Sequence, residues 1–149
     1  MIDNFFAKQI VERAKEWIEL RVPYVHRGST VRGCDCTGLL LGILQSLGYL
    51  TKYHLPMYPP DWNLHSGGKN DLLKNLSECS YEIPKNSAQP GDIILFSLGK
   101  CKAHVGILIT NTLFVHSHAG VGCIRSTLKT SRWFKRLTGA MRLDETKLK

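Results

Sequence analysis

The stretch Gly33-Cys34-Asp35-Cys36-Thr37-Gly38-Leu39 places a cysteine where a loop gives way to a helix. Apolar side chains then recur at the spacing of one helix face, which predicts a helix from about Cys36 to Leu47 that ends at Gly48. Backbone N–H groups and the dipole at a helix start favour a thiolate. Cys36 is therefore a candidate nucleophile, although most buried cysteines serve only as small hydrophobic side chains.

Upstream of this stretch, an amphipathic pattern predicts a first helix from Asn4 to Leu20, and Tyr24 to Gly33 is expected to be a loop. Gly38 and Gly42 lie inside the second helix, where each costs about 1 kcal/mol relative to alanine. We therefore expect this helix to pack closely against another element.

Downstream, Thr51 to Gly68 is predicted to be a long irregular connection, followed by a short helix around Asn70 to Leu76. The pattern then changes to short β-branched runs, which predict four strands: Asp92–Ser97, His104–Thr110, Leu113–Ser117 and Gly139–Leu143. Helices followed by strands indicate an α+β fold with a small antiparallel sheet. A length of 149 residues corresponds to a single domain, 1–149.

Three histidines lie within the predicted strands or directly after one. His104 is expected to open a strand, directly after a turn, where its side chain would project towards a cleft. A cysteine nucleophile needs an imidazole that takes its proton and returns it to the leaving group, so His104 is the candidate base. His116 and His118 lie on one face of the next strand and compete for the role of orienting that imidazole.

Five motifs in the same order resemble those of the NlpC-type papain-like cysteine peptidases of cell walls. They are Val22–Gly28 (VPYVHRG), Gly33–Leu39 (GCDCTGL), Gln89–Phe96 (QPGDIILF), His104–Ile107 (HVGI) and Phe114–Ser117 (FVHS). The compact size, the Pro-rich insertion and the ending Gly139–Arg142 look most like the single-domain peptidases encoded near bacteriophage tail genes.

The resemblance implies a papain-like α+β fold and an endopeptidase that cleaves peptidoglycan stem peptides, typically between D-γ-glutamate and the diamino acid. Cys36 would form the acyl-enzyme, His104 would act as base and then acid, and His116 would hold the imidazole. Tyr24 would help the backbone N–H of Cys36 to stabilise the oxyanion, and Asp35 would position either the substrate's free amine or the loop itself. An N-acetylmuramoyl-L-alanine amidase of similar fold and a non-catalytic phage tail component are the alternatives.

The sequence departs from the family pattern at three places. Thr37 replaces the usual serine, and Cys34 supplies a second thiol at a position that is usually apolar. The third departure is the pair of histidines, His116 and His118. We favour His116 because it follows the apolar pair Phe114-Val115, as in the family.

Five cysteines, an odd number, leave at least one thiol outside any intramolecular disulfide. A metal-binding module is one alternative, with ligands drawn from Cys34, Cys36, Cys101, His104 and Cys123. However, Cys34-x-Cys36 is tighter than the usual ligand spacing of zinc sites, so we expect no metal and no cofactor. A redox switch is another alternative, through a disulfide from Cys36 to Cys34 or to Cys101.

The net charge of +8 is concentrated near the end of the chain, where residues 125–149 hold eight basic and two acidic side chains. A basic and aromatic strip there would comprise Arg125, Lys129, Arg132, Trp133, Phe134 and Arg136. We expect a solvated basic surface, or attraction to the anionic cell wall, in preference to nucleic-acid binding. This tail is expected to lie outside the catalytic motifs.

No stretch of the sequence has the roughly 18 apolar residues of a membrane span, and acidic residues interrupt the N-terminus where a signal peptide would be apolar. The expectation is synthesis in the cytoplasm and action at the cell wall. Delivery within a virion, with phage tail components as partners, and release by lysis both fit.

Overall fold

The computed structural model of the chain describes residues 4–51, 77–98 and 101–148. Helix α1 spans Asn4–Glu19 and helix α2 spans Cys36–Ser46, so both predicted long helices are confirmed. Between them, strands β1 (Ser29–Thr30) and β2 (Gly33–Cys34) form a small antiparallel hairpin where the sequence predicted only a loop.

The main sheet has six strands in the order β3-β8-β4-β5-β6-β7, and neighbouring strands are antiparallel. The strands are β3 (Ser80–Ile83), β4 (Ile93–Leu98), β5 (Cys101–Leu108), β6 (Leu113–His118), β7 (Gly122–Thr127) and β8 (Leu137–Leu143). Short helical turns complete the fold: η2 (Lys85–Ser87), α4 (Ser131–Phe134) and η3 (Glu145–Lys147).

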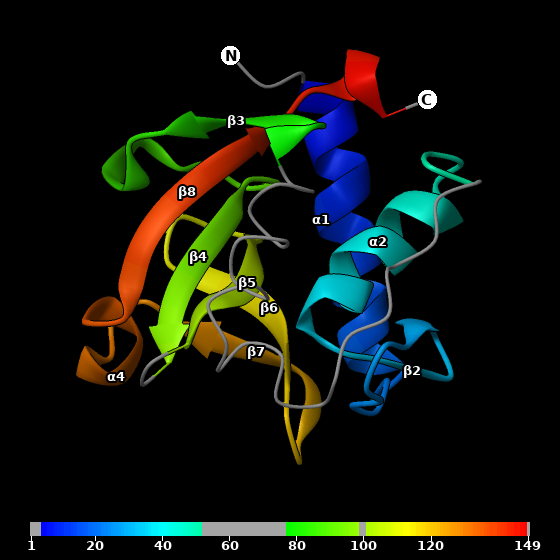
Figure 1. Cartoon of the computed structure of the whole chain (residues 1–149), viewed down its shortest axis with the longest axis horizontal. Coiled ribbons are helices and arrows are strands. Elements are labelled where there is room, and N and C mark those ends of the chain that lie inside the picture. Colours follow the sequence, from blue (N-terminus) through cyan, green and yellow to red (C-terminus); the bar gives the residue numbers. More distant parts are fainter. Residues whose placement is uncertain (1–3, 52–76, 99–100, 149) are drawn as a thin grey trace.

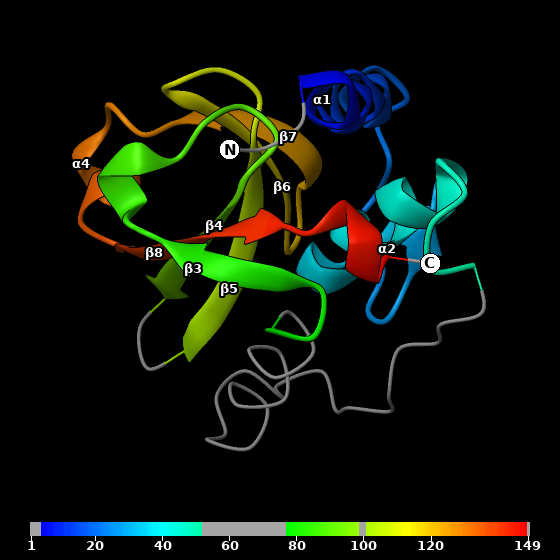
Figure 2. The ribbon, with the colours of Figure 1, turned by 90° about the horizontal axis from the view of Figure 1, so that it is seen from above.

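The sheet separates two apolar cores. Figures 1 and 2 show α1 and α2 together on one side of the sheet, with α4 on the other. Alternation along β4 divides its side chains accordingly, because Ile93 and Leu95 join the core under α1 and α2, whereas Ile94 and Phe96 join a smaller core around Trp133. The predicted α+β arrangement is therefore present.

The end of the chain is part of this sheet. Strand β8 lies between β3 and β4, and Met141 pairs with Glu82 on one side and with Ile93 on the other. Leu148, next to the last residue, is fully buried. The basic tail lies outside the motifs in sequence, as expected, but it is not spatially separate from them, since β8 is hydrogen-bonded to the strand of the Pro-Gly-Asp motif.

The four predicted strands occur as β4, β5, β6 and β8, with shifted ends. His104 does not open its strand, because β5 begins three residues earlier, at Cys101, which pairs with Leu98 beyond a bulge. Strands β3 and β7 and helix α4 were not predicted. The predicted connection 51–68 falls almost entirely, and the predicted helix 70–76 entirely, outside the described residues.

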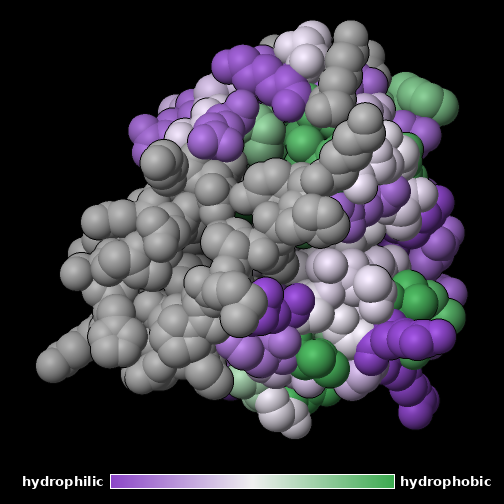
Figure 3. Space-filling model, turned by 45° about the vertical axis from the view of Figure 1, so that its right-hand side comes forward, coloured by the Kyte–Doolittle hydropathy of each residue, from purple (hydrophilic) through white to green (hydrophobic). Residues whose placement is uncertain are grey.

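Within the described ranges no helix is long and apolar enough to cross a membrane. On the face shown in Figure 3, the coloured hydrophobic side chains form small separate groups among hydrophilic ones. Among the described residues, the exposed large hydrophobic side chains are Phe5, Leu20, Val25, Val31, Tyr81, Val121 and Phe134.

Candidate active site

Asp35 holds the start of α2. It is the N-cap residue, and its Oδ1 accepts a hydrogen bond from the backbone N–H of Gly38 at 2.7 Å. Its Oδ2 accepts a second from the backbone N–H of Arg27 at 2.9 Å, and the side chain is only 1% exposed. Of the two roles that the resemblance suggested, positioning the loop is the one with observed hydrogen bonds.

The two glycines of α2 allow the preceding loop to lie directly on the helix. A Cβ added to Gly38 would sit 1.6 Å from the carbonyl oxygen of Gly28, and one added to Gly42 would sit 2.2 Å from that of Ser29. Such distances are impossible for real atoms, so a side chain at either position would push the loop away. The predicted close packing at these glycines is confirmed.

Cys36 is the first residue of α2, and its side chain is largely buried. Its Sγ lies 3.9 Å from the hydroxyl oxygen of Thr37. The helix start provides backbone N–H groups and the positive end of the helix dipole at this position, both of which stabilise negative charge.

Tyr24 lies close to this helix start and is half-buried. Burial, followed by the charges of Cys36, Asp35 and Cys34, raises the pKa of Tyr24 to about 12. The phenol therefore keeps its proton at neutral pH and can donate a hydrogen bond, as the oxyanion role requires.

His104 and His116 form a hydrogen-bonded pair that continues to a serine. The His104 Nε2 atom lies 2.8 Å from His116 Nδ1, and His116 Nε2 lies 2.9 Å from the hydroxyl oxygen of Ser126 on β7. The indole of Trp133 stacks on the His104 ring at 5.7 Å between centroids, and its edge meets His116 at 4.8 Å. Both imidazole rings are therefore fixed in orientation.

Both histidines are neutral at physiological pH. Burial, and then the charge of His118, lowers the pKa of His104 to about 4. Burial, and then the charges of His104, His118 and Arg132, lowers the pKa of His116 to about 2. In one of the two possible proton arrangements, His104 Nε2–H donates to His116 Nδ1 and His116 Nε2–H donates to Ser126. That arrangement leaves the lone pair of His104 Nδ1 free to accept a proton.

His118 is placed differently from His116. Its ring centroid lies 6.1 Å from that of His104. Its Nε2 accepts a hydrogen bond from the Arg132 guanidinium at 3.1 Å, and its Nδ1 lies 3.1 Å from the carbonyl oxygen of Ala119. Of the two candidates for the third role, only His116 is hydrogen-bonded to His104.

Hydrogen bonds and packing connect the cysteine side of the site to the histidine side. The Ser117 hydroxyl, next to His116 in β6, donates to the carbonyl oxygen of Cys34 at 2.7 Å. The backbone N–H of Cys123 donates to the carbonyl oxygen of Val22 at 2.9 Å. Helix α2 packs against β5 and β6, the strands that carry His104 and His116, and Figure 1 shows it beside them.

A buried ion pair fixes the Pro-Gly-Asp motif. The Arg142 guanidinium on β8 donates two hydrogen bonds to the Asp92 carboxylate, at 3.0 and 2.9 Å. The hydrogen bond to Asp92 raises the pKa of Arg142, and the bidentate geometry is specific to arginine. One of the basic residues counted in the tail is thus an internal structural group beside the site.

The proposed basic and aromatic strip is not a continuous surface. Trp133 is buried against Phe96, Phe114 and the two histidines, whereas Phe134 is exposed. Arg132 lies over the Trp133 ring, with its guanidinium carbon 5.0 Å from the centroid. The central aromatic residue of the strip is therefore unavailable to stack on a nucleic-acid base.

The cysteines of the alternative metal set are not brought together as ligands. Cys34 lies against Cys123, with 3.6 Å between the sulfurs, and the side chain of Cys101 is outside the described part of the structure. Within that described part, no three His, Cys, Asp or Glu side chains converge on a point that suits a metal ion.

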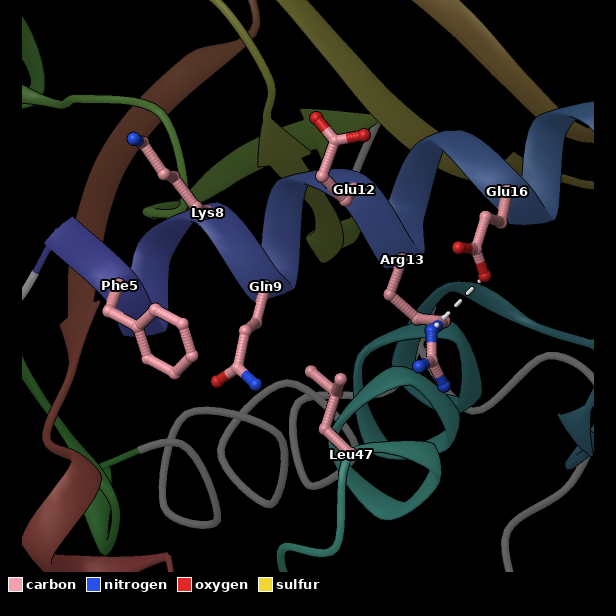
Figure 4. A pocket seen from close by; sticks show the side chains of 7 residues that line it. All are labelled: Phe5, Lys8, Gln9, Glu12, Arg13, Glu16 and Leu47. Carbon is pink, nitrogen blue, oxygen red and sulfur yellow. Dashed lines mark ion pairs between the residues drawn. The ribbon is translucent and has the colours of Figure 1, made fainter.

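A shallow depression of about 300 Å³ lies elsewhere, on the outer side of α1 (Figure 4). Its lining consists of Phe5, Lys8, Gln9, Glu12, Arg13, Glu16 and Leu47. Arg13 and Glu16, one turn apart on α1, form an ion pair at 3.2 Å. None of the predicted catalytic residues lines this depression, so it is separate from the candidate active site.

The sequence placed Ser117 in a motif but gave it no role, it did not single out Ser126, and it placed Trp133 on the surface. Ser126 belongs to β7, which the sequence pattern did not reveal, and Trp133 to α4, only four residues long. The sequence of β7 (Gly-Cys-Ile-Arg-Ser-Thr) shows no clear apolar alternation, so it offered no local signal for Ser126.

The model of one protein family, described as the NlpC/P60 family, matches residues 21–142. The chain belongs to the NlpC/P60 family. The match includes Cys36, His104, His116 and both residues of the Asp92–Arg142 pair. Membership confirms the NlpC-type resemblance seen in the five motifs.

Curated relatives in Escherichia coli (strain K12) are similar over most of the chain. One is named murein DD-endopeptidase MepS/murein LD-carboxypeptidase and is 27% identical over 135 residues, which cover 91% of this chain and 62% of that protein. Another is named probable endopeptidase NlpC and is 28% identical over 123 residues, covering 81% and 69%. The NlpC/P60 chain described here thus spans about three-fifths of the length of the first relative.

Solved structures confirm the predicted papain-like NlpC-type fold. An NLP/P60-family protein similar to a lipoprotein, from Staphylococcus aureus subsp. aureus Mu50, has a TM-score of 0.65 and 24% identity over 96% of this chain and 43% of that one. The NlpC/p60 domain of the peptidoglycan hydrolase SagA has a TM-score of 0.61 and 15% identity over 92% of this chain and 98% of that domain.

Proposed function

We propose that this chain is a cysteine endopeptidase that hydrolyses peptidoglycan stem peptides through an acyl-enzyme on Cys36. The observation that carries the proposal is the His104–His116–Ser126 hydrogen-bond chain, which can present a neutral His104 Nδ1 as a base. Family membership and relatives named as murein endopeptidases support a peptidoglycan substrate.

In the first half of the reaction, His104 takes the proton of the Cys36 thiol, and the sulfur attacks the peptide carbonyl. The backbone N–H of Cys36 and the Tyr24 hydroxyl are the proposed donors to the oxyanion; one such donor contributes about 3 kcal/mol of transition-state stabilisation. His104 then returns its proton to the leaving amine, and the acyl group stays on Cys36.

In the second half, water attacks the acyl-enzyme while His104 again acts as base. The His116 Nδ1 acceptor stabilises the transient imidazolium of His104 and holds its ring, which is the role of the third group in a triad. The neutral resting state of His104 matters here, because a protonated ring has no lone pair for the thiol proton.

The bond that we propose is the one between D-γ-glutamate and the diamino acid. The Escherichia coli relative is named both DD-endopeptidase and LD-carboxypeptidase, so those bonds are the competing outcomes. Mass spectrometry of fragments released from defined muropeptides separates all three, and also the muramoyl-alanine amidase reaction. Cleavage at the γ-glutamyl bond by the wild type, absent in Cys36→Ala and present in Cys79→Ala, is the expected result.

Delivery by a phage particle stays a prediction from the sequence. Its test is to tag the chain in its native genome and to assay purified phage particles and cell-wall fractions for the tag. Recovery in particles is expected if the protein is a tail component; exclusive recovery with the host wall would refute that partner.

A further inference from the structure

Two cysteines that the proposed mechanism does not use lie against each other. Cys34 and Cys123 are 89 residues apart in the chain, yet their sulfurs are 3.6 Å apart. Both are free thiols, with Cys34 fully buried and Cys123 6% exposed. A disulfide requires the sulfurs to approach to about 2.05 Å, a change that small rotations of the two side chains can supply.

The backbone on both sides holds the two sulfurs at this distance. The carbonyl oxygen of Cys34 accepts the Ser117 hydroxyl at 2.7 Å, and Ser117 pairs with Cys123 across β6 and β7. The N–H of Cys123 donates to Val22 at 2.9 Å, and the N–H of Cys34 donates to Pro23 at 3.0 Å. The same short segment, residues 22–23, therefore binds both cysteine backbones.

The two thiols also differ in a way that suits sequential reaction. Their hydrogen bond lowers the pKa of Cys123 and raises that of Cys34. Cys123 is also the one with some exposure to solvent. Cys123 is thus the thiol that a small disulfide would contact first, and the buried Cys34 thiol is adjacent to it.

We propose that Cys34 and Cys123 form a reversible disulfide that ties the segment before the nucleophile to β7 and leaves Cys36 reduced. The oxidant is a low-molecular-weight disulfide such as oxidised glutathione. The Cys123 thiolate attacks its S–S bond and releases one glutathione thiolate, giving a mixed disulfide. The Cys34 sulfur, losing its proton, then attacks the Cys123 sulfur and releases the second glutathione.

This site differs from both predicted redox switches, which would have used Cys36 and silenced the enzyme. A Cys34–Cys123 bond closes a long loop in the unfolded chain and therefore stabilises the fold. It also fixes the residue just before Asp35, the N-cap of the helix that starts with the nucleophile. Formation of the bond itself does not depend on the proposed function.

The test uses the full chain with Cys36, Cys79 and Cys101 each changed to alanine, so that only Cys34 and Cys123 remain. After incubation with oxidised glutathione, we expect the intact mass to fall by two hydrogen atoms and no free thiol to remain on denaturation. We also expect Tm to rise by about 10 °C, reversibly with dithiothreitol. Two free thiols, or a persistent glutathione adduct, would overturn the proposal.

A matched control adds Cys123→Ala, which should abolish both the mass change and the Tm shift. Should the multiple variant fail to fold, the wild-type chain provides a second readout. Trypsin cleavage without reduction then yields peptides 33–52 and 103–125 joined by a bond that fragmentation places on Cys34. Recovery of these peptides unlinked, or linked through Cys36, would contradict the proposal.

Discussion

Cys34 and Cys36 flank the same aspartate but occupy opposite environments. Cys36 begins α2, where the helix start favours negative charge. Cys34 ends β2, fully buried, with its sulfur against Cys123 and its carbonyl bonded to Ser117. We infer from this difference that the two neighbouring thiols have different roles: Cys36 lies where the proposed chemistry requires a thiolate, and Cys34 is held by contacts within the segment that precedes α2.

The largest expected effect on activity comes from replacing Cys36 and Cys34 with alanine, one at a time. Cys36→Ala removes the proposed nucleophile and should lower kcat/KM on muropeptides by about 10⁴-fold or more with little change in Tm. Cys34→Ala removes a buried side chain and should lower the free energy of unfolding by about 1–3 kcal/mol while the folded fraction keeps its activity. The reverse pattern, with activity lost only in Cys34→Ala, would contradict the proposed roles of the two cysteines.

The two histidines of β6 provide the second contrast. His116→Ala removes the hydrogen-bond partner of His104 and should lower kcat by about 10²-fold, because the imidazole loses its fixed orientation. His118→Ala should change kcat by less than about threefold, because its observed hydrogen bonds go to Arg132 and Ala119. Steady-state kinetics on one muropeptide compares the pair, and equal losses would refute the assignment of His116.

Substitutions at Ser126 are expected to have a smaller effect on kcat. Ser126→Ala should lower kcat by about tenfold, because the His116 Nε2–H loses its acceptor, whereas Ser126→Thr keeps a hydroxyl and should restore most of the rate. The alkylation rate of Cys36 against pH supplies a readout that does not depend on substrate. An unchanged alkylation profile in Ser126→Ala, with an unchanged kcat, would remove Ser126 from the site.

The last prediction concerns stability against pH. Unfolded histidine has a pKa near 6.5, whereas burial holds His104 at about 4 and His116 at about 2. The unfolded chain binds more protons below pH 6.5, so these groups contribute stability that is complete above pH 6.5 and is lost as the pH falls. Tm should drop between pH 6.5 and 4 less steeply in His116→Gln than in wild type; parallel curves would contradict this.

Local signals in the sequence were sufficient for α1, α2 and the strands of the motifs. The position of Cys36 at a helix start could be predicted because a helix start is a local feature, and His104 and His116 could be placed on strands because they belong to short motifs. The position of Ser126 could not be predicted, because β7 starts at a glycine and combines two apolar with several polar residues. The register of β7 with β6 therefore depends on long-range pairing. Trp133 was interpreted as part of a basic surface. Helix α4 is only four residues long, which is too short to show the apolar periodicity that would have assigned Trp133 to the core.

The most direct test of this division between the thiols is to alkylate the folded, reduced protein at neutral pH with limiting iodoacetamide, then locate the label and assay the same samples. We predict that the label appears first on Cys36, that muropeptide hydrolysis falls in proportion to it, and that Cys34 reacts only after denaturation. Hydrolysis that persists after complete labelling of Cys36, or early labelling of Cys34, would contradict the account.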